Sequence, residues 1–268
     1  VYSGYKAVAE LGELLTEGGY ERDIVYGYVD LEQMGRAKLR QSRLAGAWPG
    51  TNKYLYIDFE LELLPPAEDC NRYDAPNPFL AGLTDKNQEL GEMFELQKKA
   101  LHNRLSAAHI NDIILGLSGG LDSTLAFLVA AETARENGYT LHVLSMPCFG
   151  TSRQTKSNAQ RLAEAAQVQF QELDITQAAI DQLALIDHQV VGDVTYENVQ
   201  ARQRTMILLN KANQLNALVL GTADLSETAL GFCTYGGDHL SMYNINASIP
   251  KTLVRELVLW YAAQAEPN

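Results

Sequence analysis

From Asn87 onward, short apolar runs alternate with segments of helical composition, and this alternation limits the possible folds more than any other feature of the sequence. We expect strands in DIILGL (112–117), LHVLSM (141–146), VQFQELDI (168–175) and ALVLG (217–221). We expect helices at 87–108, Ser123–Glu136, Thr155–Ala166, from about Thr176, at Glu197–Asn216 and after Pro250. Apolar strands that alternate with helices predict an α/β fold, a doubly wound parallel sheet with helices on both faces.

The residues before this region have a different pattern. Two strand-like runs, DIVYGYVDL (23–31) and KYLYIDFELELL (53–64), flank a basic, helix-compatible stretch at 32–46. A stretch rich in proline, Asn and Asp follows and is typical of a linker. We therefore predict a small partial α+β unit at 1–66, a linker at 67–86 and the main domain at 87–268.

The composition restricts the class of protein. The 268 residues carry a formal net charge of −12, which argues against the broad basic surface that binds nucleic acid. No apolar run reaches the roughly 18 residues of a membrane span, and the N-terminus lacks the basic start of a signal peptide. The three scattered cysteines, Cys70, Cys148 and Cys233, suit a reducing compartment. We expect a cytoplasmic protein without a membrane or nucleic-acid partner.

The stretch LGLSGGLDSTLAF, Leu115–Phe127, is the clearest candidate for a ligand site. Its Ser-Gly-Gly turn ends the first predicted strand of the main domain, and Asp122-Ser123 opens a helix. Glycines let the backbone approach a ligand with its N–H groups pointing inward, and the helix N-terminus adds about half a positive charge. These features predict a phosphate cradle. The alternative is an ordinary turn in which Asp122 or Ser123 caps the helix.

The match Ser-Gly-Gly-x-Asp-Ser resembles the pyrophosphate loop of the N-type ATP pyrophosphatases. The resemblance implies a sheet of the adenine nucleotide alpha-hydrolase type. It also implies a reaction in which ATP is cleaved between its α and β phosphates, a substrate oxygen is adenylated and pyrophosphate leaves.

Three further stretches narrow the resemblance: TYENVQARQR (195–204), LGTADLSETALGFCTYGGD (220–238) and ASIPKT (247–252). Their order and spacing resemble the NAD synthetases, in particular the glutamine-dependent form, over about Asn87–Tyr261. The N-terminal region resembles the last strands of the nitrilase-like glutaminase domain of that form. The Cys, Glu and Lys of such a glutaminase have no counterpart here, so we expect an incomplete stretch of a larger enzyme.

The resemblance implies that the intact enzyme uses ATP to amidate deamido-NAD to NAD, with ammonia from glutamine and with AMP and pyrophosphate as products. ATP is then a substrate, Mg²⁺ its companion ion, and a homo-oligomer the expected assembly, with the glutaminase domain in cis. We expect this chain to be weakly active or inactive with ammonia and unable to use glutamine.

The resemblance also assigns residues. It implies that Asp122 and Glu227 hold Mg²⁺, with a helix cap and a solvated first-turn acid as the respective alternatives. It implies that Asp122 and Asp238 take part in catalysis. The residues implied to bind ATP are Gly116, Leu117, Ser118, Gly119, Gly120, Leu121, Asp122, Ser123 and Thr222. The residues implied to bind deamido-NAD are Asn198, Arg202, Glu227, Phe232, Asp238 and Lys251.

Each assignment has a structural alternative. Thr222 could cap a helix, Asn198 and Arg202 could form an exposed polar face, Phe232 could be core, and Lys251 could be an exposed lysine. The chain also departs from the small ammonia-dependent enzymes, since Ser145 replaces an Arg before the Leu-Pro that follows their second strand.

Two other functions stay open at this point. One is another pyrophosphatase-loop enzyme, such as GMP synthetase, asparagine synthetase or a tRNA-thiolating enzyme. The other is a nucleotide-binding fragment without turnover.

Overall fold

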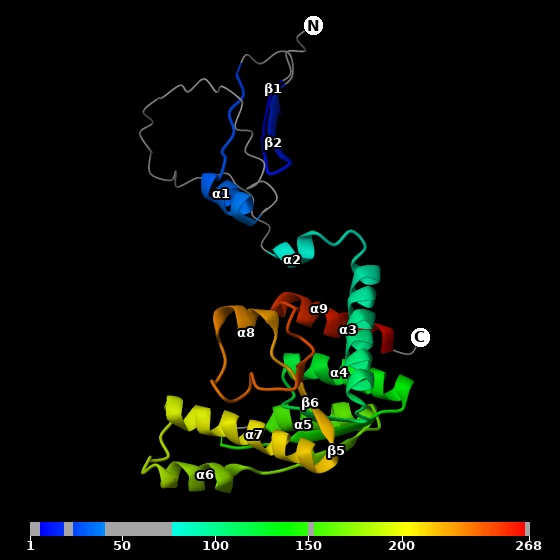
Figure 1. Ribbon diagram of the computed structural model, residues 1–268, viewed down its shortest axis with the longest axis vertical. Helices are drawn as coiled ribbons and strands as arrows, with labels where there is room; N and C mark the ends of the chain where they lie inside the picture. The colour runs from blue at the N-terminus through cyan, green and yellow to red at the C-terminus, as the bar shows by residue number, and fades with distance from the viewer. Residues whose placement is uncertain (1–5, 19–23, 41–76, 150–152, 266–268) are drawn as a thin grey trace. The chain divides into compact units, whose positions relative to one another are not determined.

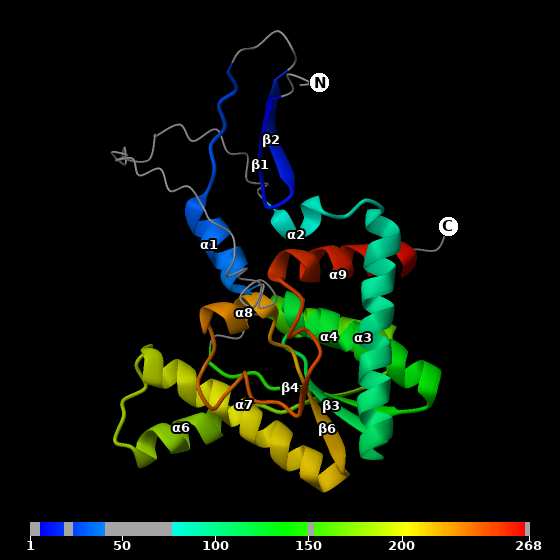
Figure 2. The ribbon, with the colours of Figure 1, turned by 45° about the horizontal axis from the view of Figure 1, so that its top comes forward.

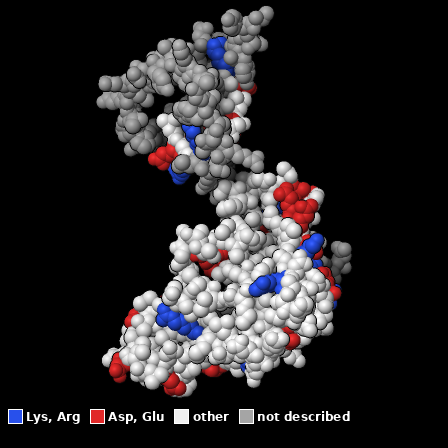
Figure 3. Space-filling view, in the orientation of Figure 1, with Lys and Arg blue, Asp and Glu red and all other residues white. Residues whose placement is uncertain are grey.

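The computed structural model describes residues 6–18, 24–40, 77–149 and 153–265 (Figure 1). The chain divides into two compact units, Val1–Asp74 and Ala75–Asn268, and each is described by itself. No helix among the described residues combines the length and the apolar character needed to cross a membrane. On the face of the second unit drawn in Figure 3, Lys and Arg form small separate patches.

The first unit contains an antiparallel hairpin of β1 (Lys6–Glu10) and β2 (Glu13–Gly18), followed by helix α1 (Leu31–Arg40). Leu11 and Gly12 turn the hairpin with positive φ of 52° and 93°.

The strand predicted at 23–31 is wrong over the described residues 24–31. Residues 24–30 form no strand, and Leu31 already belongs to α1. Tyr26 and Tyr28 are exposed, so the run does not supply the half-buried face that its pattern suggested. Asp30 instead accepts a hydrogen bond from the backbone N–H of Gln33 and starts the helix. The strand predicted at 53–64 lies outside the described residues.

The second unit contains a five-stranded sheet of order β5-β4-β3-β6-β7, and every neighbouring pair is parallel. Its strands are β3 (Asp112–Gly116), β4 (Thr140–Ser145), β5 (Gln169–Glu172), β6 (Ala217–Gly221) and β7 (Tyr243–Asn244). The helices are α2 (Pro78–Ala81), α3 (Lys86–Ala108), α4 (Leu121–Asn137), α5 (Arg153–Ala165), α6 (Thr176–Leu185), α7 (Val194–Leu215), α8 (Leu225–Leu230) and α9 (Lys251–Ala265). The predicted doubly wound α/β fold is confirmed, and α8 and β7 are elements that the sequence patterns did not indicate.

The sheet separates two apolar cores. Along β3, Ile113 and Leu115 face the core shared with α3, α4 and α9, whereas Ile114 faces the core shared with α6 and α7. Figure 2 shows these two groups of helices on opposite sides of the sheet. Burial on both faces explains why the central strands β3 and β6 are nearly continuous apolar runs rather than alternating. Because helices cover both faces of these strands, a ligand can approach them at their ends.

Helix ends follow the expected chemistry at several points. Asn137-Gly138 ends α4 as predicted, with Gly138 in the left-handed conformation at φ 73°. His109 and Asn216 take the same conformation after α3 and α7. These three stops fix where the chain leaves each helix for the following strand, β3, β4 or β6.

A hydrogen bond of 2.6 Å from Tyr261 Oη to Glu132 Oε1 joins α9 to α4. Burial and this carboxylate raise the pKa of Tyr261 to about 12. We expect Tyr261→Phe to lower the free energy of unfolding by about 1–2 kcal/mol at pH 8. Because the folded pKa lies above the usual value of 10.0, this stabilisation is complete below pH 10 and is lost as the pH rises to about 12.

Urea unfolding followed by circular dichroism, at pH values from 8 to 12, measures this effect. Tyr235→Phe is the matched control, because the Tyr235 side chain is exposed and its loss is expected to leave stability unchanged. A destabilisation by Tyr261→Phe that is as large at pH 12 as at pH 8 would contradict the prediction.

Candidate active site at the strand ends

A pocket of about 580 Å³ opens at the carboxyl ends of the central strands β3, β4 and β6. Its floor is the β3–α4 loop, its walls are α7 and the segment after β6, and Leu208 and Met146 form part of its apolar lining. In parallel α/β sheets, ligands bind at this edge, where helix N-termini and loops meet. The predicted phosphate loop therefore lies in a cavity large enough for a small ligand.

The β3–α4 loop has the conformation expected of an anion cradle. Gly119 has a φ of 81°, which a residue with a side chain adopts only with strain. Gly120 is the N-cap of α4, and no side chain accepts hydrogen bonds there from the first amides of the helix. Ser123 Oγ lies 3.0 Å from Ser118 Oγ and donates to the Gly120 carbonyl oxygen. The alternative of a helix capped by Asp122 or Ser123 is therefore wrong.

The pocket lining includes most of the residues that were assigned to ATP. Gly119 and Leu121 belong to the same loop, although their atoms do not line the cavity. Thr222, just after β6, is not a helix cap, because the N-cap of α8 is Asp224. The residues of that set which line the pocket are Gly116, Leu117, Ser118, Gly120, Asp122, Ser123 and Thr222.

Three carboxylates converge on the ammonium group of Lys251 at the start of α9. Both oxygens of Asp122 lie 2.7 Å from Lys251 Nζ, Asp224 Oδ2 lies at 2.9 Å and Glu227 Oε1 at 3.6 Å. The predicted acid pair, Asp122 and Glu227, therefore comes together although the two residues follow different strands. Lys251 is not the plain exposed lysine of the alternative interpretation.

Asp224 was not among the predicted site residues, yet it organises this acidic cluster. Its side chain is fully buried and accepts a hydrogen bond of 2.8 Å from the backbone N–H of Glu227. Glu227 Oε2 in return accepts from the Asp224 backbone N–H at 3.2 Å, which completes a capping box at α8. The sequence signal was present in the Asp-x-x-Glu spacing of 224–227.

A buried asparagine connects the two loops that carry the acids. Asn246 is fully buried, and its Nδ2 donates to the Asp122 carbonyl oxygen at 3.0 Å and to the Thr222 carbonyl oxygen at 3.1 Å. Gln97 of α3 donates to Asn246 Oδ1 at 3.3 Å. Nothing in the local sequence pattern identified Asn246, because its role depends on loops 124 and 24 positions away.

The electrostatics of the cluster favour a second cation. Burial raises the pKa of Glu227, because its carboxylate is partly removed from water. Burial lowers the pKa of Lys251, but its hydrogen bonds to Asp122 and its ion pair with Asp224 outweigh this and raise the pKa above its usual range. With all four groups ionised, three carboxylates and one ammonium leave a net charge of −2.

Arg204 of α7 supplies positive charge on the opposite wall of the pocket. Its Nε donates to the Met146 carbonyl oxygen at 3.2 Å, and burial lowers the pKa of its guanidinium. It was not among the residues assigned to the site from the sequence. The helical spacing alone did not reveal that α7 turns Arg204 toward the cavity and Arg202 away from it.

The residues assigned to deamido-NAD are distributed differently. Asn198 Oδ1 accepts from Thr234 Oγ1 at 2.9 Å, and Arg202 Nε donates to the Tyr235 carbonyl oxygen at 3.0 Å. Asp238 lines the pocket and accepts from the Thr234 backbone N–H at 2.7 Å. These contacts hold the loop after α8 against α7.

Phe232 is 79% exposed on this loop after α8, so the interpretation of it as core is wrong. His239 Nδ1 lies 2.9 Å from the Thr234 carbonyl oxygen and stands beside the site without entering it. Over the described ranges, no three His, Cys, Asp or Glu side chains are arranged as a complete metal-binding set.

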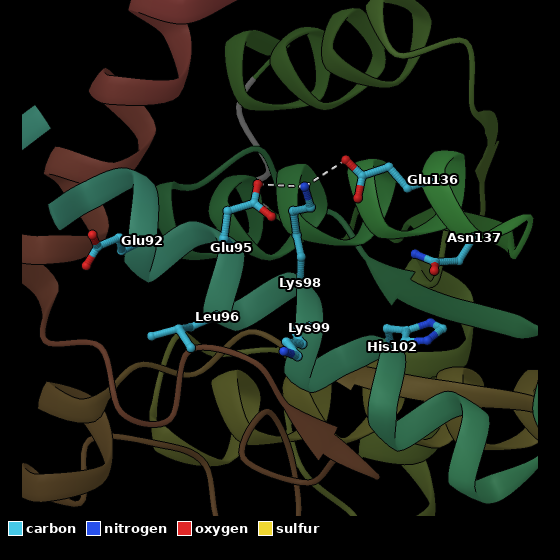
Figure 4. A pocket seen from close by; sticks show the side chains of 8 residues that line it. All are labelled: Glu92, Glu95, Leu96, Lys98, Lys99, His102, Glu136 and Asn137. Carbon is cyan, nitrogen blue, oxygen red and sulfur yellow. Dashed lines mark hydrogen bonds and ion pairs between the residues drawn. The ribbon is translucent and has the colours of Figure 1, made fainter. Parts of the chain in front are cut away.

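A second hollow, of about 550 Å³, lies on α3 and the end of α4 and has a different character (Figure 4). Its buried cation, Lys98, is neutralised by Glu95 and Glu136, each with an oxygen 2.7 Å from Lys98 Nζ. Figure 4 shows the Lys98 ammonium group between these two acids. The charge of Lys98 is therefore already satisfied within the protein, in contrast to the acidic cluster at the strand ends.

In this parallel α/β sheet, a glycine-rich loop and acidic side chains lie together at one strand-end pocket, an arrangement typical of nucleotide-binding proteins of the pyrophosphatase-loop class. The family model described as NAD synthase matches residues 93–266, and the chain belongs to this family.

Relatives agree with this membership. The glutamine-dependent NAD(+) synthetase of Mycobacterium tuberculosis is 41% identical over 228 residues, which cover 81% of this chain and 33% of the relative. That of Mycobacterium leprae is 44% identical over 222 residues, which cover 78% of this chain and 32% of the relative. The chain thus spans about a third of the length of these curated relatives.

Solved structures share the fold. A glutamine-dependent NAD+ synthetase from Acinetobacter baumannii in complex with ADP superimposes with a TM-score of 0.62 at 28% identity, over 66% of this chain and 34% of that one. An NMN synthetase from Francisella tularensis superimposes with a TM-score of 0.59 at 27% identity, over 65% of this chain and 71% of that one.

Proposed function

We propose that this chain carries the synthetase site of a glutamine-dependent NAD synthetase, which converts deamido-NAD to NAD at the expense of ATP. The observation that carries the proposal is the placement of Asp122 and Glu227 beside the Ser118-Gly119-Gly120 cradle, at the edge of one pocket. The family membership and the named activity of the relatives support the same conclusion.

The chemistry explains why both a phosphate cradle and acids are required. A carboxylate is a poor acyl donor, because oxide would have to leave. Attack of the nicotinate carboxylate oxygen on the α-phosphorus of ATP breaks the bond to the β-phosphate and releases pyrophosphate. Ammonia then attacks the acyl carbon, AMP leaves with the bonding electron pair, and the ammonium formed loses a proton. Amides of the β3–α4 loop and the Arg204 guanidinium are placed to stabilise the phosphate charge that moves in these steps.

The acidic cluster fits Mg²⁺. Its net charge of −2 matches a divalent ion, and its carboxylate oxygens are the ligands that Mg²⁺ prefers. Asp122 and Glu227 would hold the ion. Two protein carboxylates are typical for Mg²⁺ when phosphate oxygens complete its coordination. The ion would neutralise the phosphates and the leaving pyrophosphate.

The remaining assignments form part of the same proposal. Asp238 on the pocket wall would act near the reacting carboxylate, and exposed Phe232 would stack on the nicotinate ring. Asn198 and Arg202 contact the loop after α8. They would bind the dinucleotide either together with this loop or in place of these contacts. Lys251 would contact a phosphate.

We extend the proposal to the N-terminal residues, the source of ammonia, the assembly and the compartment. We infer that residues 1–66 are the end of a nitrilase-like glutaminase domain, with 67–86 as a linker. Ammonia then comes from glutamine in the intact enzyme, the assembly is a homo-oligomer, and the reaction takes place in the cytoplasm. The exposed thiol of Cys233 is compatible with a reducing compartment.

An amidation assay tests the function. We expect the purified protein to form NAD from deamido-NAD, Mg²⁺–ATP and ammonium, with AMP and pyrophosphate in equal amounts. The turnover is expected to be slow. XMP, aspartate and nicotinate mononucleotide serve as alternative acceptors. Amidation of one of these in preference to deamido-NAD would reject the proposal, and so would release of ADP and phosphate in place of AMP and pyrophosphate.

A further inference from the structure

The ammonium group of Lys251 lies in the position that the proposed function gives to a divalent ion. It contacts both oxygens of Asp122 and approaches Glu227, the two acids proposed to hold Mg²⁺. We propose that Lys251 is an internal counter-cation: it occupies the acid pair when no metal–nucleotide is bound, competes with the divalent ion for Asp122, and transfers to the nucleotide phosphate when that ion enters. This inference rests on the proposed function.

The negative charge of the acidic cluster calls for a counter-cation. Asp122 lies in the first turn of α4, whereas Asp224 and Glu227 lie at the start of α8. Without a cation their negative charges would repel one another in a partly buried place. Lys251 removes one of the three charges. It therefore keeps the site assembled before the ligand arrives, and it must also lower the attraction of the site for a second cation.

Asp224 anchors the ammonium group of Lys251. Asp224 is fully buried, and the capping box with Glu227 fixes its position. Its Oδ2 holds Lys251 from a side that is distinct from Asp122. The Lys251 side chain is 44% exposed, so its end has room to turn while it stays near Asp224. Asp224 is thus a positioning residue, because it acts through Lys251 and through the backbone of Glu227.

The counter-cation role predicts that removal of the Lys251 charge has opposite effects on the binding of a free divalent cation and of Mg²⁺–ATP. If Lys251 competes with the ion, its removal strengthens binding of a divalent cation to the nucleotide-free protein. If Lys251 then moves to a phosphate, the same removal weakens binding of Mg²⁺–ATP. A lysine with a purely structural role would not produce opposite effects on the two ligands.

Titration with Mn²⁺, followed by electron paramagnetic resonance without nucleotide, tests the first effect. We expect Lys251→Gln to bind Mn²⁺ about tenfold more tightly than the wild type, because one positive charge has left the site. Lys251→Arg keeps the charge and should resemble the wild type. Lys86→Gln is the matched control, since it removes a lysine paired with Glu256 of the same helix α9 but away from the acidic cluster. An unchanged or weaker affinity in Lys251→Gln would overturn the proposal.

Calorimetry with Mg²⁺–ATP tests the second effect and the role of Asp224. We expect Lys251→Gln and Asp224→Asn each to weaken binding about tenfold, and the double variant to be no weaker than the single ones, because Asp224 acts through Lys251. Asn can still cap α8, so Asp224→Asn leaves the helix start intact. Multiplied losses in the double variant would overturn the role given to Asp224, and unchanged ATP affinity in Lys251→Gln would overturn the transfer to phosphate.

The inference and the proposed function fail in different ways. If Asp122→Asn and Glu227→Gln bind Mn²⁺ as well as the wild type does, the acid pair is not the metal site and the proposed function loses its main support. If these two variants lose Mn²⁺ binding while Lys251→Gln leaves it unchanged, the metal site stands and only the counter-cation role is rejected.

Discussion

Asp122→Asn is expected to weaken the binding of Mg²⁺–ATP about a hundredfold or more. The substitution removes the proposed carboxylate ligand for the ion, and a partly buried charged contact of this kind is worth about 3 kcal/mol, or roughly two factors of ten. It also removes the partner that both oxygens of Asp122 provide for Lys251. Isothermal titration calorimetry at saturating Mg²⁺ measures the loss directly.

The control for this variant is an acid at the start of β3, the strand that precedes the loop and the helix α4 that carry Asp122. Asp112→Asn removes the same charge at the start of β3, where Asp112 Oδ1 lies 2.7 Å from His142 Nε2. It should leave ATP affinity unchanged, because the carboxyl end of β3 holds the pocket. If both variants bind Mg²⁺–ATP as tightly as the wild type does, Asp122 is not a ligand of the metal–nucleotide complex.

Gly119→Ala is expected to weaken ATP binding at least tenfold while it destabilises the fold by only about 1–2 kcal/mol. A φ of 81° is strained for alanine, so the loop would relax away from the conformation that aims its amides at a phosphate. The remaining loss comes from the added methyl group at the place where a phosphate would approach the backbone. Calorimetry gives the affinity, and urea unfolding gives the stability.

The control variant Gly138→Ala introduces backbone strain at a distance from the proposed phosphate site. Gly138 has a similar positive φ of 73° at the opposite end of α4, and a Cβ atom there meets nothing within 4 Å. We expect the same loss of stability and no change in ATP affinity. Equal effects of the two variants on affinity would mean that Gly119 acts through the stability of α4 rather than at the phosphate site.

Buried hydrogen bonds fix the geometry on which both Asp122 and Gly119 depend. Asn246 holds the backbone of Asp122 and of Thr222, so the phosphate loop after β3 and the acid-bearing segment after β6 keep a fixed spacing. The capping box between Asp224 and Glu227 then fixes the position of the Glu227 carboxylate. The site is therefore organised mainly by buried hydrogen bonds to the backbone, which are costly to break and set geometry more closely than surface ion pairs do.

Local patterns in the sequence were sufficient for most of the second unit. The apolar runs at 112–117 and 217–221 became β3 and β6, and Asn137-Gly138 ended α4 where its chemistry requires. Period and capping signals are local, so they can be read without knowledge of the partners. The strand predicted at 23–31 was wrong over residues 24–30, because strand composition by itself does not establish the backbone pairing that makes a strand.

The site was predicted only in part. The Ser118–Ser123 loop and the pairing of Asp122 with Glu227 followed from motif order, and the structure brings these residues together. Arg202 was assigned to the dinucleotide and Arg204 was not, but α7 directs Arg204 into the pocket and leaves Arg202 exposed on the loop side. A difference of two positions on a helix turns a side chain by more than half a turn, and which side faces the ligand depends on how the helix packs.

The sequence by itself determined the parallel α/β layout, the glycine turn at the strand end and the types of side chain available for phosphate and metal. The tertiary structure alone decided that Lys251 stands between Asp122 and Glu227, that Asp224 anchors it, and that Asn246 fixes the two loops. The physical reason is distance along the chain. Lys251 and Asp122 are 129 positions apart, and only the packing of α9 against α4 beside the sheet brings their charges within 2.7 Å.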